Sequence, residues 1–261
     1  MSRTLSTLRT RIRNNWPSGF FTDNLTDPQL DTWINDTQRW VCRGTIYVPD
    51  EYGRQKLICH NFSWQKEESS ASTVDRQRRY ALPDGTGDVM KFKTEITFEI
   101  VKYDGYRRPL TRRLKVDIEN DLRFADVEGY GIPECYCLDD GDIWLYKLPD
   151  HTYNNNEAFT LNFEYYGFLP ELSGDDDHNV LTDDFPEVLE YGATADGFRF
   201  ARNFEEAEYW EAKKRDMFIQ MLKADQHQEF AALEEGFCPA AGQGLGEGRS
   251  TYLRPQVEKG Y

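Results

Sequence analysis

Hydrophobic positions recur every three or four residues at the start of the chain. Leu5, Leu8 and Ile12 would share one face of a helix over residues 4–14, with arginines on its other faces. A second helix is predicted to begin at Thr26-Asp27-Pro28-Gln29, which has the order of a capping box with proline in the first turn. Gly44 is expected to end this helix, because glycine readily adopts the left-handed conformation found at helix C-termini.

The hydrophobic period changes to two in the next part of the chain. Apolar and polar residues alternate over 94–103 and 159–165, which is typical of half-buried strands. Asp140-Gly141 is predicted to form a tight hairpin turn between strands at Cys135–Leu138 and Ile143–Lys147, and Asp104-Gly105 to separate two further strands. Two other segments are interpreted as a polar loop, Glu67–Thr73, and as a short helical turn, Asp117–Phe124.

Helical periodicity returns after this β segment. Leu181-Thr182-Asp183 is predicted to open a helix that runs to about Arg202, with Thr182 as its N-cap. A longer helix is predicted over 204–235, where Gly236 would end it. Residues 237–261 are rich in glycine, and such a segment cannot bury enough surface to fold alone.

The predicted fold class is α+β. The helices of segments 1–44 and 169–236 are expected to pack into one bundle. Residues 45–168 would be inserted as an antiparallel β-sandwich-like domain. Residues 237–261 are expected to form an extended, flexible C-terminal tail that is free to dock on a partner.

Composition narrows the class of protein. The 261 residues carry a formal net charge of −15, opposite in sign to the basic excess of a free nucleic-acid binder. No apolar run is long enough to span a membrane, and Met1–Arg13 lacks the apolar segment of a signal peptide, so synthesis in a cytoplasm is expected. The five cysteines are irregularly spaced, which argues against a disulfide framework.

No catalytic constellation stands out. The four histidines are scattered, and the sequence lacks a G-x-S-x-G elbow, a phosphate-binding G-x-x-x-x-G-K loop and an H-E-x-x-H metal motif. Acidic residues at 139–142 are interpreted as a turn and Asp175-Asp176-Asp177 as a solvated run. We therefore expect a protein that is not an enzyme, with no metal and no cofactor.

Charge is segregated along the chain. The first fifteen residues hold four arginines and no acid, whereas residues 171–190 hold eight acids and no lysine or arginine. Two further arginine clusters lie at 76–79 and 107–113. Blocks of opposite sign can orient one subunit against the next. The residues predicted to make such subunit contacts are Arg9, Arg13, Glu205 and Glu208.

The order of several short motifs over residues 1–235 resembles the head-to-tail connector and adaptor proteins of tailed phages. Each motif is weak alone, and their order carries the resemblance. They are Tyr80-Ala81-Leu82-Pro83, Pro109-Leu110, Gly131-Ile132-Pro133-Glu134-Cys135-Tyr136, Ile143 to Asp150, Phe163-Glu164-Tyr165-Tyr166-Gly167, Pro170-Glu171-Leu172-Ser173, Leu181 to Pro186, Leu189 to Ala193, and Glu205 to Trp210.

The resemblance implies an architectural role in the virion neck. Such adaptors form a ring, commonly dodecameric, between the portal and the tail. The implied partners are other copies of the chain, the portal protein, tail or nozzle proteins, and double-stranded DNA that passes without sequence-specific binding; no membrane is implied. A terminal segment docks on the portal in such proteins, and here we expect the tail to do so through Tyr252, Leu253, Arg254 and Tyr261.

Two other functions are compatible with the sequence. One is a tail-tube or tail-completion protein of similar layout. The other is a carbohydrate-binding or carbohydrate-hydrolysing β domain, with Trp64, Trp144 and Tyr146 as a stacking platform. Binding to portal or to tail proteins would separate the first from an adaptor, and a glycan screen would test the second.

Overall fold

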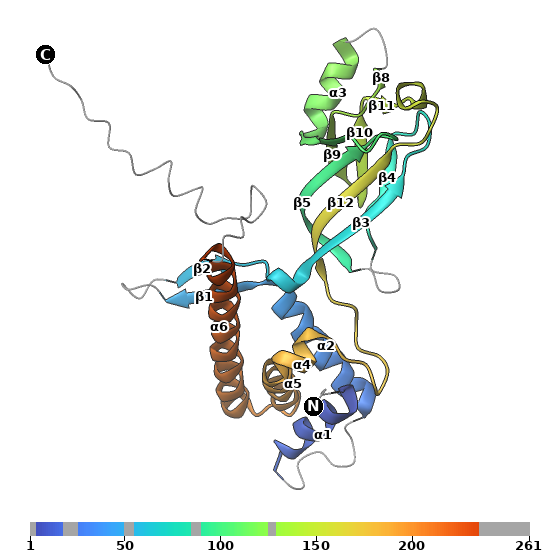
Figure 1. Cartoon of the computed structure of the whole chain (residues 1–261). Helices are drawn as coiled ribbons and strands as arrows, with labels where there is room; N and C mark the ends of the chain where they lie inside the picture. The colour runs from blue at the N-terminus through green and yellow to red at the C-terminus, as the bar shows by residue number, and fades with distance from the viewer. Residues whose placement is uncertain (1–3, 18–25, 50–54, 85–89, 125–128, 235–261) are drawn as a thin grey trace, which may run out of the picture. The chain divides into compact units, whose positions relative to one another are not determined.

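The structure is a computed structural model that describes residues 4–17, 26–49, 55–84, 90–124 and 129–234. The chain divides into two compact units, residues 1–218 and 219–261. The described residues have a mixed α+β fold, as predicted, with helices before and after a series of strands (Figure 1).

The helices are α1 (Leu5–Asn14), α2 (Asp27–Arg43), α3 (Lys115–Phe124), α4 (Val180–Asp184), α5 (Pro186–Phe200) and α6 (Phe204–Glu234), with 3-10 turns η1 (Ser63–Gln65) and η2 (His151–Asn154). The strands are β1 (Thr45–Pro49), β2 (Gln55–Cys59), β3 (Lys66–Ser72), β4 (Arg79–Ala81), β5 (Lys91–Val101), β6 (Arg107–Pro109), β7 (Thr111–Arg112), β8 (Tyr130–Gly131), β9 (Cys135–Asp139), β10 (Asp142–Tyr146), β11 (Leu148–Pro149) and β12 (Thr160–Phe168).

The two N-terminal helices confirm the helical pattern. The apolar residues of α1, Leu5, Leu8 and Ile12, are fully buried, and polar and arginine residues make up the rest of the helix. At the start of α2, the Gln29 side chain accepts a hydrogen bond from the backbone N–H of Thr26 at 3.2 Å, as a capping box requires. Gly44 follows the last turn with a φ of 65°, so it ends α2 in the left-handed conformation expected of glycine.

The helix predicted from Leu181 to Arg202 is two helices that meet at Phe185. The predicted cap was also wrong, because Asn179 rather than Thr182 caps α4. The Asn179 side chain accepts hydrogen bonds from the backbone N–H groups of Leu181 at 3.0 Å and Thr182 at 3.2 Å. Asparagine is among the strongest N-caps because its short side chain reaches these exposed donors. The Thr182 hydroxyl instead donates to the Asn179 carbonyl at 2.8 Å.

Helix α5 is buried on most sides and packs against both α1 and α2. Two glycines allow this close approach. A Cβ atom on Gly192 would lie 2.3 Å from the Thr37 hydroxyl on α2, and one on Gly197 would lie 2.3 Å from the Trp16 ring. Both positions therefore admit no side chain without a shift of their neighbours.

Helix α6 confirms the predicted long helix to within a residue, although the predicted stop, Gly236, lies outside the described residues. In the first unit, Phe218 of α6 contacts Trp40 of α2 with ring centroids 4.9 Å apart. Phe218 also meets Phe62, just before η1, at 5.6 Å. The ammonium group of Lys214 lies 4.4 Å from the centre of the Trp40 ring, so aromatic and cation–π contacts join these segments.

Strands β3, β12, β5 and β6 form one four-stranded antiparallel sheet in that order. Figure 1 shows β12 between β3 and β5. The central pair of this sheet confirms the two alternating segments, and Phe163 of β12 lies opposite Phe98 of β5. The interpretation of Glu67–Thr73 as a loop was wrong, because this segment forms most of β3 and pairs with β12. The polar composition of β3 suits its place at the sheet edge, where one face and one row of backbone groups meet solvent.

Strands β4, β10, β9 and β7 form the second four-stranded sheet. The predicted hairpin at Asp140-Gly141 joins β9 and β10, and both turn residues have positive φ values, 50° and 80°. The prediction of an entirely antiparallel domain was wrong in two places, since β7 pairs in parallel with β9 and β8 in parallel with β11. Strands β1 and β2 form a separate antiparallel pair.

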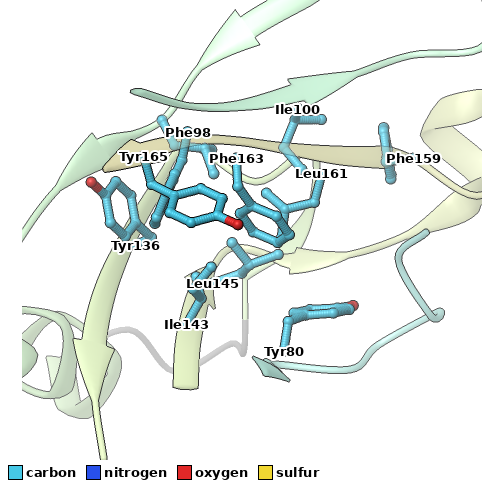
Figure 2. Close-up of a cluster of buried hydrophobic side chains, with 11 residues drawn as sticks. Tyr80, Phe98, Ile100, Tyr136, Ile143, Leu145, Phe159, Leu161, Phe163 and Tyr165 are labelled. Atoms are coloured by element: carbon cyan, nitrogen blue, oxygen red, sulfur yellow. The ribbon is translucent and has the colours of Figure 1, made fainter. Parts of the chain in front are cut away.

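The inner faces of the two four-stranded sheets supply one hydrophobic core. Figure 2 shows Phe98 and Ile100 of β5 with Leu161, Phe163 and Tyr165 of β12 on one side of this core. The other side is formed by the second sheet. Its contributions are Tyr80 of β4, Tyr136 of β9, and Ile143 and Leu145 of β10.

A buried polar group connects α2 to the first sheet. The side-chain amide of Gln65 is fully buried and donates to the carbonyls of Cys42 at 2.8 Å and Gly167 at 3.1 Å. Its carbonyl accepts from the backbone N–H of Phe62 at 3.1 Å. The ammonium group of Lys93 on β5 also donates to the Cys42 carbonyl. We call Cys42, Phe62, Gln65, Lys93 and Gly167 the junction group.

Candidate interaction surfaces

The described residues hold neither a metal-binding cluster nor a membrane-spanning helix. No group of three or more His, Cys, Asp or Glu side chains among these residues could hold a metal ion. None of the described helices combines the length and the apolar character needed to cross a membrane. The described cysteines, at 42, 59, 135 and 137, are not joined in disulfides.

Arg9, predicted to contact another subunit, is occupied within its own chain. Its guanidinium group forms two hydrogen bonds with the Asp31 carboxylate, at 2.7 and 2.8 Å, and one with Asp175 at 2.5 Å. The Asp31 hydrogen bonds are the largest cause of a raised Arg9 pKa, although burial opposes them. Only 9% of the Arg9 side chain is exposed. This residue therefore links α1 to α2 through Asp31, and to the acidic segment that contains Asp175.

The acidic run at 175–177 forms a folded turn, in which Asp175 and Asp176 are exposed to solvent as predicted and Asp177 is half-buried. The Asp177 carboxylate accepts backbone hydrogen bonds from Ser173 and Gly174, each at 2.7 Å, and these bonds lower its pKa. The backbone N–H of Leu5, at the start of α1, donates to the Asp177 carbonyl at 3.1 Å. The N-terminal arginines and the acidic segment thus complement each other inside the chain.

The other three predicted contact residues lie on the surface. Arg13 pairs with Asp27 at 2.5 Å, and both side chains remain about half exposed. Glu205 and Glu208 are exposed in the first turns of α6 and form no ion pair with another described residue. Their contact with another subunit stays a prediction.

The two arginine clusters of the β domain differ in how far they are neutralised. In the second cluster, Arg108 and Arg112 form close ion pairs with glutamates, whereas Arg107 lies 3.7 Å from Glu99. In the first cluster, the guanidinium groups of Arg76 and Arg79 lie no closer than 3.7 Å to a carboxylate among the described residues. No hydrogen bond from them or from the Arg78 side chain to a described residue is present; Arg76 and Arg79 are exposed and Arg78 is half-buried.

The first cluster surrounds an aromatic hollow. The guanidinium carbon of Arg79 lies 4.3 Å from the centre of the Trp144 ring, and the Lys115 ammonium lies 4.4 Å from it. Arg76 lies over the Tyr130 ring at 5.2 Å. A hydrogen bond to Asp139 raises the pKa of Lys115. The hollow measures about 460 Å³, and we call its polar and aromatic lining the basic–aromatic surface: Arg76, Arg78, Arg79, Lys115, Tyr130 and Trp144.

The outer face of the other sheet is acidic and polar. A shallow hollow of about 430 Å³ lies over β3, β12 and β5, and Arg107 is the cation in its lining. Glu164 pairs with Lys66, and Glu99 lies 3.7 Å from Arg107. Glu68 is exposed and forms no ion pair with a described residue. We call this lining the acidic sheet face: Glu68, Ser70, Thr97, Glu99, Asn162 and Glu164.

The three aromatic residues considered for carbohydrate stacking do not form one group. Trp64 stacks on Phe62 with ring centroids 5.1 Å apart. Trp144 and Tyr146 pack instead against a small cluster that contains Ile118. The two cations on Trp144 also occupy its ring, which leaves less of it for a sugar.

Two aspects of these surfaces were absent from the sequence predictions. The sequence showed the arginine cluster at 76–79. It did not show that this cluster surrounds Trp144, because β4, α3 and β10 are separated in the sequence and come together only in the folded chain. Lys115 had no signal beyond its place before a predicted helical turn. The predicted docking residues Tyr252, Leu253, Arg254 and Tyr261 lie outside the described residues.

Comparison with known protein families gives one match. A family model described as SU10 adaptor protein matches residues 3–234, which is nearly the whole chain. The match includes all the described helices and strands. No curated protein matches the chain well enough to count as a relative.

Proposed function

Because the chain belongs to the SU10 adaptor protein family, we propose that this phage structural adaptor assembles as a ring in the virion neck, between portal and tail. The family match over residues 3–234 is the observation that carries this proposal. The ring is proposed to be dodecameric. The helices of 26–43 and 183–235 would form its wall as a bundle, with the β-sandwich-like domain inserted into it.

Net charge supports a ring through which DNA passes. At −15 per chain, the assembled subunits would repel the phosphate backbone of double-stranded DNA. Such a wall would let DNA slide without sequence-specific binding. The proposed role is architectural and requires no enzymatic activity and no cofactor.

Electron microscopy of the purified full-length chain, alone and mixed with the portal protein of the same phage, tests the ring. We expect a ring of density added to one end of the portal. The matched control is a mixture with the tail protein alone. A chain that binds only the tail protein would overturn the portal assignment and support a tail-completion protein.

We propose that residues 237–261 dock on the portal through Tyr252, Leu253, Arg254 and Tyr261. Tyrosine and arginine often dominate interface energies, and a glycine-rich segment can follow a partner's surface. A chain truncated at Gly236 should keep its circular dichroism spectrum and lose portal binding. A full-length chain with the four residues changed to alanine controls for length, and undiminished portal binding by both variants would refute the docking role.

Arg13, Glu205 and Glu208 remain proposed subunit contacts, since each is exposed. Arg9 was proposed with them, but its guanidinium group is engaged by Asp31 and Asp175. A role for Arg9 in subunit contacts would therefore be indirect, because Arg9 positions α1 against α2 within its own chain. Reversing the charge of Glu205 and Glu208 should weaken ring assembly, whereas unchanged assembly would exclude them.

A further inference from the structure

We propose that the basic–aromatic surface of one copy binds the acidic sheet face of a second copy, in a head-to-tail contact between β domains. This inference rests on the proposed ring and adds a specific contact to it. The two surfaces were defined above by their residues, and both belong to sheets that share one core.

The geometry of the two sheets sets the direction of this contact. Both sheets turn their inner faces toward the core in Figure 2, so their outer faces point away from each other. Trp144 lies on the outer face of β10, since its neighbours Ile143 and Leu145 belong to the core. Glu164 lies on the outer face of β12 for the same reason, between Phe163 and Tyr165. One chain therefore presents the two surfaces in opposite directions, which suits a heterologous, head-to-tail contact; such contacts form a ring when the rotation between successive copies closes.

The charges that line the two surfaces are complementary. Four cations and no carboxylate line the basic–aromatic surface, although several carboxylates lie around it: the cations are Arg76, Arg78, Arg79 and Lys115. On the acidic sheet face, Lys66 and Arg107 offset Glu164 and Glu99, which leaves Glu68. Copies with a net charge of −15 repel one another, so a stable contact needs a place where opposite signs meet.

Hydrogen-bonding groups on the two surfaces also match. Guanidinium groups are donors only, and those of Arg76, Arg78 and Arg79 make no hydrogen bonds with described residues. The acidic sheet face offers carboxylates together with the hydroxyl and amide oxygens of Ser70, Thr97 and Asn162. Arginine, tryptophan and tyrosine are also the residue types that contribute most to protein interfaces.

Two further observations favour a protein partner over nucleic acid. Leu114 and Val116 flank Lys115 and are 73% and 63% exposed, and burial of such apolar area stabilises protein–protein contacts. Carboxylates around the four cations offset much of their charge, whereas duplex DNA binding depends on neutralising several phosphates. The Trp144 ring already carries two cations, so it is not free to stack on a base.

Charge exchange in the full-length chain tests the contact through Arg78 and Glu68, which form no ion pair with another described residue. Arg78→Glu and Glu68→Arg would each be compared with the wild type by sedimentation velocity over a range of concentrations. Each reversal should weaken self-association at least about tenfold, because like charges would then face each other. The double variant R78E/E68R should recover association, and an equimolar mixture of the single variants should form heterodimers.

Matched controls carry the same charge changes outside both surfaces. Lys56→Glu on β2 and Glu157→Arg before β12 are exposed and should associate like the wild type. If the wild type associates and neither Arg78→Glu nor Glu68→Arg weakens this association more than the controls do, the proposed contact is wrong. The ring proposal is not affected by that result. A wild-type chain that stays monomeric at every concentration would also overturn the contact, while the ring would still be judged by microscopy on the portal.

Discussion

Replacing Gln65 by methionine tests whether the junction group stabilises the fold. Methionine has nearly the same length and keeps the packing of the buried side chain, but it removes two donors and one acceptor. The carbonyl of Gly167 would lose its donor at 3.1 Å, and the backbone N–H of Phe62 would lose its acceptor at 3.1 Å. The Cys42 carbonyl would keep its hydrogen bond from Lys93.

The expected loss follows from the two backbone groups left without this partner. An unsatisfied buried donor or acceptor costs about 1–3 kcal/mol, so Gln65→Met should lower the free energy of unfolding by about 3 kcal/mol. The Cys42 carbonyl adds little because its second donor remains. Lys93 would lose a weak contact with the Gln65 carbonyl, 3.4 Å away.

Urea unfolding followed by both tryptophan fluorescence and far-ultraviolet circular dichroism measures this loss. Gln55→Met on β2 is the control, because that glutamine is exposed and should change stability by less than about 0.5 kcal/mol. Hydrogen exchange should also speed up at the Phe62 amide. A loss below about 1 kcal/mol for Gln65→Met, or an equal loss in the control, would refute the role assigned to the junction group.

Three further predictions concern packing, a buried ion pair and pH. Gly192→Ala should destabilise the chain by about 1–3 kcal/mol, because the new methyl group would overlap Thr37, and adding Thr37→Ala should recover part of this loss in thermal unfolding. Arg9→Met should cost about 3 kcal/mol since it leaves carboxylates unpaired, whereas the exposed Arg13→Met should cost less than about 1 kcal/mol; equal losses in urea unfolding would contradict this ranking. Burial raises the pKa of the Cys42 thiol from 9.0 to about 11, so the unfolded chain ionises first and stability should fall by up to about 2–3 kcal/mol between these pH values. Cys42→Ala should reduce that alkaline loss, and a wild type with the same pH profile as the variant would show that another group causes it.

Local patterns in the sequence predicted most of the helices and the central strands. The apolar spacing of α1, the capping residues and Gly44 of α2, and the hairpin at Asp140-Gly141 all depend on neighbours within a few residues. Such features depend on local properties of the chain, namely side-chain periodicity and the φ preferences of glycine and aspartate. The α+β class followed from their order along the chain.

The errors share a different physical cause. Strand β3 has a sequence of charged and small residues with little strand propensity of its own, and its pairing with β12 makes it a strand. The parallel pairings of β7 and β8 join segments whose partners are set by the packing of the whole domain. The cap at Asn179 was missed because Asn179 and Thr182 both lie near the start of the helix and both are residue types that cap helices.

Among the candidate interaction residues, the sequence determined which charges exist and the tertiary structure decided which are available. The sequence showed four arginines in the first fifteen residues, but only folding brought Arg9 against Asp31 and Asp175 and removed it from the surface. It showed an arginine cluster at 76–79, but only the meeting of β4, β10 and α3 placed that cluster around Trp144. Periodicity is a property of neighbours in the chain, whereas ion pairing and exposure depend on residues far apart in sequence, which only the folded chain brings together.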